Sequence, residues 1–192
     1  MTVPDGYGTP TFQEAEVNGL PAVQALAAST QLLRDAAQNQ AFAGQVLSGD
    51  QGTALAVFKT STNAAAIWGT HTDTAEAGYV AASGMRSYVN DGGANVAYAT
   101  YSAGTFAIHT WHLAGGTLYS GINDTRTTSM SSVSTGSYSC GCFLVILGSS
   151  GPGRYLDGEL AELIFYATAL PEADRKLTEQ YLAGKYGITL PY

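Results

Sequence analysis

The side chains best suited to chemistry in this sequence are aromatic rings interleaved with short polar side chains. The chain has 12 Tyr and two Trp among 192 residues. Aromatic faces stack on the apolar faces of sugars, while Asn and Asp hydrogen-bond to sugar hydroxyls. The glycan-contacting candidates are Trp68, Tyr79, Tyr88, Asn90, Asp91, Trp111, Tyr119, Asn123 and Asp124. The alternative is that the two tryptophans fill a core and that the Asn and Asp residues only make turns.

The usual nucleophiles, bases and metal ligands show no catalytic spacing. Neither G-x-S-x-G nor another local nucleophile motif is present. His71, His109 and His112 lie in strand-like segments, where His109 and His112 would point to opposite faces of one strand. Cys140 and Cys142 are too close for an unstrained disulfide, so we expect two small buried thiols. We therefore expect no catalytic residues, no metal site and no cofactor.

Composition and charge limit the class of protein and its partners. Hydrophobic residues make up 45% of the chain and charged residues 12%, which is typical of a compact globular domain. The net charge of −7 disfavours nucleic acid as a partner. No apolar run approaches the roughly 18 residues of a membrane span, so we expect no membrane insertion. The first ten residues lack the pattern of a signal peptide, and we expect synthesis in a cytoplasm.

The elements that must position these side chains are short strands. From residue 53 to residue 150 the segments are rich in β-branched and aromatic residues, with turn signals about every 8 to 12 residues. Asn90-Asp91-Gly92-Gly93 and Gly115-Gly116 predict two hairpins. Residues 34–52 fit either a short helix or an irregular loop. This rhythm predicts an all-β sandwich or barrel.

The two ends of the chain differ from this pattern. Residues 1–11 contain two Pro and two Gly and predict an extended N-terminal arm, pinned against the body or a neighbouring subunit. Residues 12–192 predict a single domain. Near its end we expect a helix over residues 171–184, beginning at Pro171 and docking through an apolar stripe that includes Leu177, Tyr181 and Leu182.

The C-terminal strand and helix carry a resemblance to a known family. Residues 158–170 read GELAELIFYATAL and residues 181–188 read YLAGKYGI. This ending resembles that of the concanavalin A-like lectin/glucanase superfamily, specifically the laminin G-like jelly-roll domains of phage virion and tail proteins and bacterial surface proteins. Residues 18–26 and 55–62 are similar to the family's early strands. The resemblance implies a two-sheet antiparallel jelly-roll sandwich, in which the closing strand 158–168 pairs near the first strand and the helix caps the sandwich.

Two departures from the family argue against calcium binding and against glycoside hydrolysis. Where many relatives carry an Asp-rich stretch, this chain has Ser29 and Thr30, so a calcium role tied to that stretch is not expected. Glucanases of this superfamily use E-x-D-x-x-E, because glycoside hydrolysis needs two carboxyl groups about 5 to 9.5 Å apart. Here Glu14-Ala-Glu16 lacks a third acid, and the string from Asp157 to Glu162 belongs to the closing motif. We therefore expect that the protein is not an enzyme.

The resemblance implies a non-enzymatic structural component of a phage virion surface, of the decoration or fibre type. Glycan-binding adhesion to host cells is compatible with that role. The expected partners are other virion subunits and further copies of the chain in a homo-oligomer, by analogy a trimer. The alternative is a stand-alone carbohydrate-binding module, and the third hypothesis is a glycoside hydrolase. Buried tryptophans would favour the structural role, whereas an open patch near Asn90 and Asp124 would favour the lectin.

Overall fold

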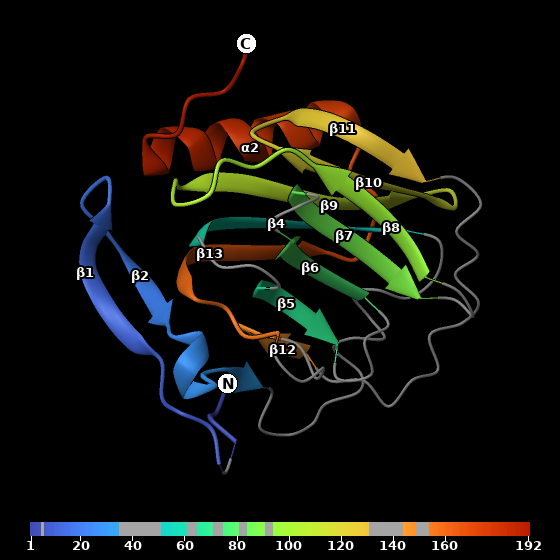
Figure 1. Cartoon of the computed structure of the whole chain (residues 1–192). Coiled ribbons are helices and arrows are strands. Elements are labelled where there is room, and N and C mark those ends of the chain that lie inside the picture. Colours follow the sequence, from blue (N-terminus) through green and yellow to red (C-terminus); the bar gives the residue numbers. More distant parts are fainter. Residues whose placement is uncertain are drawn as a thin grey trace.

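The computed structural model describes most of the chain as a sandwich of two antiparallel sheets (Figure 1). The described residues are 1–4, 6–34, 51–60, 65–70, 75–80, 84–90, 94–130, 144–148 and 154–192. Cys140, Cys142, His71 and Asp91 lie outside these ranges, as does most of the segment 34–52. The all-β two-sheet architecture predicted from the sequence is confirmed.

The first sheet has seven strands in the order β1-β2-β13-β4-β9-β10-β11. Their bounds are β1 Thr11–Val17, β2 Leu20–Ala25, β13 Gly158–Tyr166, β4 Gln51–Thr60, β9 Ala107–Ala114, β10 Thr117–Ile122 and β11 Thr125–Met130. The closing strand β13 lies between β2 and β4, so the last strand pairs beside the first hairpin as the resemblance implies. It ends two residues before the predicted boundary.

The second sheet has six strands in the order β3-β12-β5-β6-β7-β8. Their bounds are β3 Leu33–Arg34, β12 Leu144–Ile146, β5 Ala65–Thr70, β6 Ala75–Val80, β7 Gly84–Asn90 and β8 Ala94–Ala99. A short 3-10 helix, Ala27–Ser29, precedes β3. The chain visits the second sheet three times: with β3, with β5 to β8, and with β12 before it returns to the first sheet as β13.

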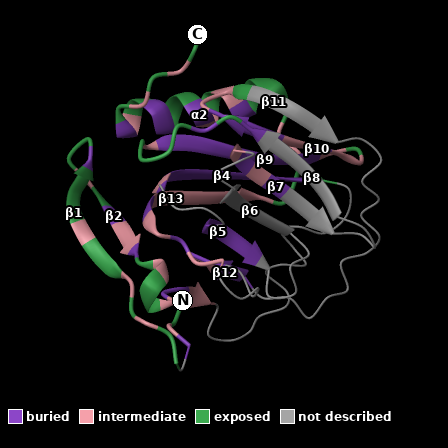
Figure 2. Ribbon diagram, viewed as in Figure 1, coloured by how far each residue is buried: buried purple, intermediate pink, exposed green. Residues whose placement is uncertain are grey.

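The core lies between the two sheets, as the buried strands in Figure 2 show. Side chains of a strand alternate between its two faces, and β9 is buried on both. Trp111 of β9 meets Trp68 of β5 edge to face, with ring centroids 5.7 Å apart, and Phe165 packs on Trp68 at 5.1 Å. The opposite face of β9 carries Ile108, which packs with Leu182 of the terminal helix. The seven-stranded sheet is therefore covered on both faces in this region.

The helix α2 spans Glu172–Tyr186, beginning one residue after the predicted start and ending two residues beyond the predicted end. Gly187 ends it with φ of 66°, a conformation that glycine adopts without strain. The predicted docking stripe was partly wrong, because Leu177 and Tyr181 are 62% and 56% exposed. Leu182 is buried as predicted. The docked face also includes charged residues, described below.

Contacts between α2 and β13 explain the specific residues of the closing motif. Lys185 forms an ion pair with Glu162 at 2.9 Å, and the hydroxyl of Tyr186 donates to the carbonyl of Ala161 at 3.3 Å. At Gly158 a Cβ atom would lie 2.0 Å from the carbonyl oxygen of Lys59, so only glycine allows this pairing of β13 with β4. The motif therefore serves closure of the sandwich.

The N-terminal arm packs against its own domain. Thr2 exchanges two backbone hydrogen bonds with Arg34, at 2.8 and 2.9 Å. The Gln31 side chain donates to the carbonyl of Thr9 at 2.8 Å, and the ring of Tyr7 lies against another tyrosine ring of the body. Across the described residues, no helix is long and apolar enough to span a membrane.

Candidate functional site

The two tryptophans predicted to contact glycan lie in the core. Trp68 is 0% exposed and Trp111 is 1% exposed. A sugar must reach the face of a ring to stack on it, and here those faces pack against each other and against Phe165. Neither tryptophan can therefore contact a glycan, and their prediction as binding residues is corrected in favour of the core role.

Asn123 and Asp124 form the turn between β10 and β11. Both have positive φ, 48° and 65°, which suits the tight turn of a hairpin. The side-chain oxygen of Asn123 accepts a hydrogen bond from the backbone N–H of Ile108 at 2.8 Å, and Asp124 pairs with Arg175. These contacts fit the alternative in which the two residues shape the turn.

The other predicted glycan-contacting residues are spread over both sheets. Tyr119 is half-buried on β10, with its ring 5.7 Å from that of His112. Tyr79 lies on β6, and Tyr88 and Asn90 lie on β7, in the other sheet. The structure thus does not bring the described members of the predicted set together at one place, and a glycan role for Tyr79, Tyr88, Asn90 and Tyr119 stays a prediction.

The histidines of β9 point to opposite faces, as predicted. The Nε2 atom of His109 lies between the hydroxyls of Ser87 and Ser120, at 3.2 and 3.0 Å, inside the sandwich. Burial lowers the pKa of His109 to about 3, so this ring is neutral at pH 7. On the other face, Nδ1 of His112 contacts the hydroxyl of Thr53 at 3.1 Å. His109, fully enclosed, cannot reach a substrate.

A buried ionic cluster joins α2 to the β10–β11 turn. Arg175 contacts Asp124 and Glu179, and Thr110 of β9 donates to the second Glu179 oxygen at 2.6 Å. Burial raises the pKa of Glu179 to about 6, despite these partners. Although burial opposes it, hydrogen bonds with Glu179 and Arg175 lower the pKa of Asp124. This cluster fixes the helix on the sheet and is closed to ligands.

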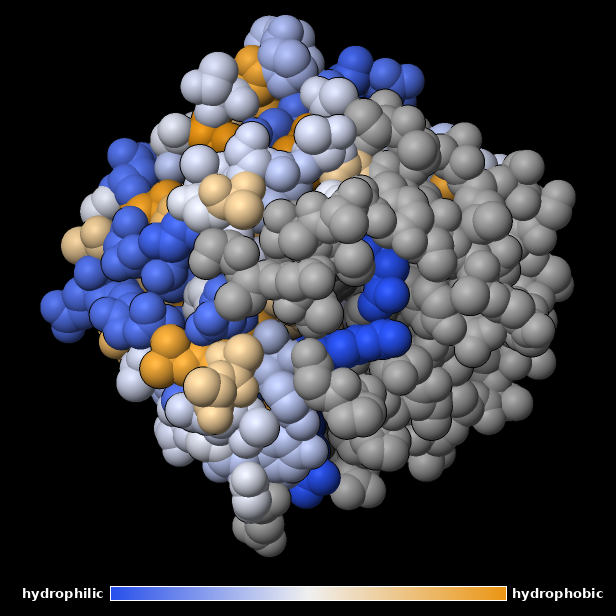
Figure 3. Space-filling view, viewed as in Figure 1, coloured by the Kyte–Doolittle hydropathy of each residue, from blue (hydrophilic) through white to orange (hydrophobic). Residues whose placement is uncertain are grey.

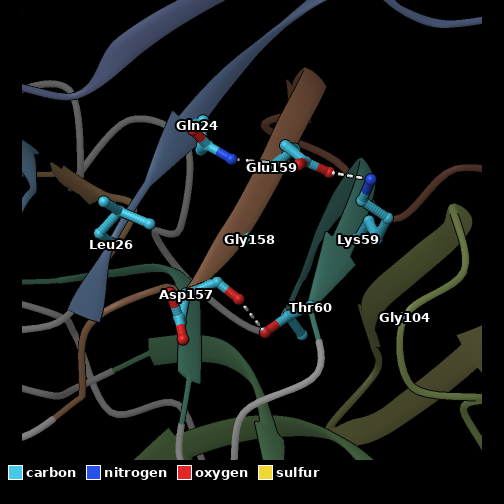
Figure 4. Close-up of a pocket in the computed structure, with 8 residues that line it drawn as sticks. All are labelled: Gln24, Leu26, Lys59, Thr60, Gly104, Asp157, Gly158 and Glu159. Carbon is cyan, nitrogen blue, oxygen red and sulfur yellow. Dashed lines mark hydrogen bonds and ion pairs between the residues drawn. The ribbon is translucent and has the colours of Figure 1, made fainter. Parts of the chain in front are cut away.

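A polar pocket opens at one end of β2, β4 and β13 (Figure 4). Its volume is about 220 Å³, below the roughly 300–1,000 Å³ of sites for drug-sized ligands. The lining residues are Gln24, Leu26, Lys59, Thr60, Gly104, Asp157, Gly158 and Glu159.

Strand register places three of these polar side chains in one row. Glu159 is directly opposite Gln24 on one neighbouring strand and Lys59 on the other. The amide of Gln24 points to Glu159 Oε1 at 3.5 Å, and Lys59 Nζ lies 2.5 Å from Glu159 Oε2 (Figure 4). Gln13 extends the row by donating to the Gln24 oxygen at 3.1 Å. The row is therefore a preformed hydrogen-bonding surface across four strands.

Lys59 is held by carboxylates on two sides. Its Nζ atom also pairs with Glu16 at 2.9 Å. Although burial lowers it, the hydrogen bonds with Glu159 and Glu16 raise the pKa of Lys59. The ammonium group is therefore charged at neutral pH and already paired within the protein.

The surface around the β1–β2 hairpin, at the left of Figure 3, is mainly hydrophilic with a few hydrophobic side chains between. Leu26, on the pocket wall, is 45% exposed, and Phe12 of β1 is 63% exposed. A pocket wall of this kind offers both hydrogen-bonding groups and a small apolar contact.

A second cavity, of about 360 Å³, lies beside the C-terminal tail. It is lined by Thr100, Ile122, Asn123, Thr125, Thr189, Leu190 and Pro191. Of the residues predicted to contact glycan, Asn123 lines this cavity. Within the described ranges, no group of three His, Cys, Asp or Glu side chains could hold a metal ion.

The residues of the polar row were not predicted from the sequence as binding residues. Gln24 and Glu159 are 135 positions apart, and Lys59 lies on a third strand. The sequence does place polar residues in the closing strand and in the early strands that β13 joins, and this pattern could have indicated them. Using that signal requires the register of all three strands.

Comparison with known proteins shows likeness in structure but not in sequence. No protein-family model matches the chain, and no curated protein matches it in sequence. Among solved structures, domain 4 of AbnA, a GH43 extracellular arabinanase from Geobacillus stearothermophilus in complex with arabinotriose, is 16% identical with a TM-score of 0.64. The match covers 90% of this chain and 84% of that one.

Two further structures extend this likeness. The CBM40 of the Ruminococcus gnavus IT-sialidase, bound to α2,3 sialyllactose, is 12% identical with a TM-score of 0.63, covering 88% of this chain and 97% of that one. The NanB sialidase of Streptococcus pneumoniae, as a K499G mutant, is 12% identical with a TM-score of 0.62. That match covers 80% of this chain but 26% of the sialidase chain, so this chain spans about a quarter of its length. The fold is the jelly roll of lectin-like proteins.

Proposed function

We propose that this chain is a carbohydrate-binding module that binds glycan without cleaving it. The observation that carries the proposal is the extent of the structural likeness. Two domains of larger enzymes, each solved with an oligosaccharide, match this chain over 88–90% of its length and over 84–97% of their own. The sialidase chain is matched over 26% of its length. The match thus extends over most of these two glycan-bound domains.

The polar pocket supports the proposal from the side of chemistry. Sugars present hydroxyl groups in fixed directions, and a site that recognises them needs preformed hydrogen-bonding groups with a small apolar contact. The row of Gln24, Glu159 and Lys59 supplies the first, and Leu26 supplies the second. We place the glycan in this pocket.

The absence of catalysis is part of the proposal and rests on the state of the carboxylates near the pocket. Hydrolysis requires one carboxyl group as a proton donor and another as a nucleophile or base. Glu159 is held by Lys59, and Glu162 is held by Lys185. Carboxylates paired in this way favour hydrogen-bonding and structural roles.

The expected role on a virion surface, with other virion subunits or further copies of the chain as partners, stays a prediction. It is compatible with a glycan-binding module, since a virion surface protein can adhere to cells. The burial of the two tryptophans favours the structural role, whereas the glycan-binding proposal depends on a pocket that other residues line.

A glycan array with the purified chain tests the proposal. We expect binding to at least one oligosaccharide and no release of reducing ends from it. Gln24→Ala should weaken that binding several-fold, since a hydrogen bond contributes about 0.5–1.5 kcal/mol. Gln180→Ala, on the exposed face of α2, is the matched control and should bind as the unmodified chain does. Absence of binding across a broad array, or cleavage of the bound glycan, would count against the proposal.

A further inference from the structure

We infer that the polar pocket selects glycans that offer hydroxyl groups and carry no carboxylate. This inference rests on the proposed carbohydrate-binding function and names its ligand class. It follows from an inventory of donors, acceptors and charges in the pocket.

The pocket offers a buried acceptor. Glu159 is 6% exposed and lines the cavity. Its Oε2 atom forms the 2.5 Å ion pair with Lys59 Nζ, whereas its Oε1 atom faces the Gln24 amide at 3.5 Å, which is long for a hydrogen bond. Buried acceptors are normally satisfied, and a carboxylate oxygen can accept more than one hydrogen bond. A ligand hydroxyl can supply a further donor to Oε1.

The donors of the pocket already serve acceptors of the protein. Lys59 Nζ contacts Glu159 and also Glu16, at 2.9 Å. The amide of Gln24 points to Glu159, and the hydroxyl of Thr60 donates to the backbone carbonyl of Asp157 at 2.9 Å. An ammonium has three N–H groups and an amide two, so a ligand carboxylate could reach only the remaining N–H groups of Lys59 and Gln24, beside the carboxylates that already hold them.

The charges act in the same direction. The ionisable lining residues are Lys59, Asp157 and Glu159, and Glu16 adds a further carboxylate beside Lys59. Lys59 is thus held between two carboxylates, Glu159 and Glu16, and the eight lining residues include no arginine, the residue that binds carboxylates in a bidentate manner. The net charge of −7 adds long-range repulsion of anionic glycans. A carboxylated sugar is therefore disfavoured both inside the pocket and during its approach.

Matched pairs of oligosaccharides test the inference. The probes are lactose with α2,3-sialyllactose and galacto-oligosaccharides with oligogalacturonides, alongside an array of other neutral chains, all at 150 mM salt. We expect the bound glycans to be neutral, with any carboxylated counterpart at least about tenfold weaker. Binding to a carboxylated glycan as tight as, or tighter than, its neutral partner would overturn the inference and leave the carbohydrate-binding function standing. Failure to bind any glycan would overturn both.

A substitution tests the role of the buried acceptor. Glu159→Gln keeps the size of the side chain but replaces a carboxylate oxygen with an amide donor, and Glu172→Gln, on exposed helix surface, is the matched control. We expect Glu159→Gln to weaken the best neutral glycan about tenfold or more, and to narrow the difference from its carboxylated partner. Unchanged affinity in a variant whose melting temperature matches the control would overturn the assignment of Glu159.

Discussion

Replacing Arg175 with methionine should destabilise the protein strongly, because it leaves two buried carboxylates without their cation. The Arg175 side chain is 3% exposed, that of Asp124 is 8% exposed, and that of Glu179 is 0% exposed. Methionine fills much of the same volume, so the change removes charge with little loss of packing. The resulting cost reports how much the ionic cluster contributes to holding α2 on the sheet.

The expected magnitude follows from the burial of all three groups. Removing one member of a buried ion pair costs about 3–5 kcal/mol. In a domain of this size each kcal/mol lowers the melting temperature by about 2–4 °C, so the melting temperature should fall by about 6–20 °C. The loss should be larger at pH 8 than at pH 5. Burial already raises the pKa of Glu179 to about 6, so at pH 5 protonation relieves the unpaired charge.

Urea unfolding followed by tryptophan fluorescence measures this cost, since Trp68 and Trp111 are both buried in the folded state. The matched control is Lys176→Met at the next position, where the ion pair with Glu172 is on the surface. Its effect should be much smaller than that of Arg175→Met, because exposed ion pairs contribute little to stability. If Arg175→Met lost no more stability than this control at pH 8, or lost more at pH 5 than at pH 8, the reasoning would be refuted.

Three further predictions concern the closing strand, the core and the arm. Gly158→Ala should destabilise the fold by about 1–3 kcal/mol, because the new Cβ would lie 2.0 Å from the Lys59 carbonyl oxygen. Gly184→Ala, on the open surface of the helix, should instead stabilise it by up to about 1 kcal/mol. Equal effects of the two substitutions in urea unfolding would contradict this. The folded pKa of His109, about 3, lies below its ordinary 6.5, so its contribution to stability is present above pH 6.5 and is lost as pH falls towards 3. Between pH 7 and pH 5, the free energy of unfolding of His109→Gln should therefore fall by about 2 kcal/mol less than that of the unmodified chain. Parallel curves of unfolding free energy against pH would disprove this. Deleting residues 1–10 should leave the sandwich folded and, if the chain forms a homo-oligomer, should weaken it; light scattering that shows the same oligomer with and without the arm would argue against a role of the arm in assembly.

Much of the fold could be predicted because its boundaries depend on local chemistry. Pro171 and Gly187 bracket the helix through backbone constraints that act within a few residues. The hairpin at Gly115-Gly116 formed as predicted, between β9 and β10, because two glycines with positive φ fit a tight turn. These features need no knowledge of distant parts of the chain.

The docked face of α2 could not be predicted in the same way. Hydrophobic spacing favoured Leu177 and Tyr181, yet the structure buries Arg175 and Glu179 instead. A charged pair is buried only where a further partner, here Asp124, lies opposite it at the contact between the helix and the sheet. That partner comes from a turn 51 residues away, and helix periodicity contains no information about it.

The candidate site illustrates the same limit. Tryptophans are suited both to sugar contact and to core packing, and the choice for Trp68 and Trp111 is made by the sheet face on which each lies. The pocket forms because β13 inserts between β2 and β4, which places Glu159 between Gln24 and Lys59. Each of these residues is ordinary in its own segment, and the site exists only after the sheet is assembled.

The most direct test of the central proposal is a chemical-shift map of the labelled protein titrated with the neutral oligosaccharide that binds best in the array. The proposal predicts that the largest shifts of backbone amide signals fall at the pocket, around Gln24, Lys59 and Gly158, and saturate with added glycan. Shifts concentrated at the cavity around Asn123, or no saturable shifts at millimolar glycan, would contradict glycan binding at this pocket.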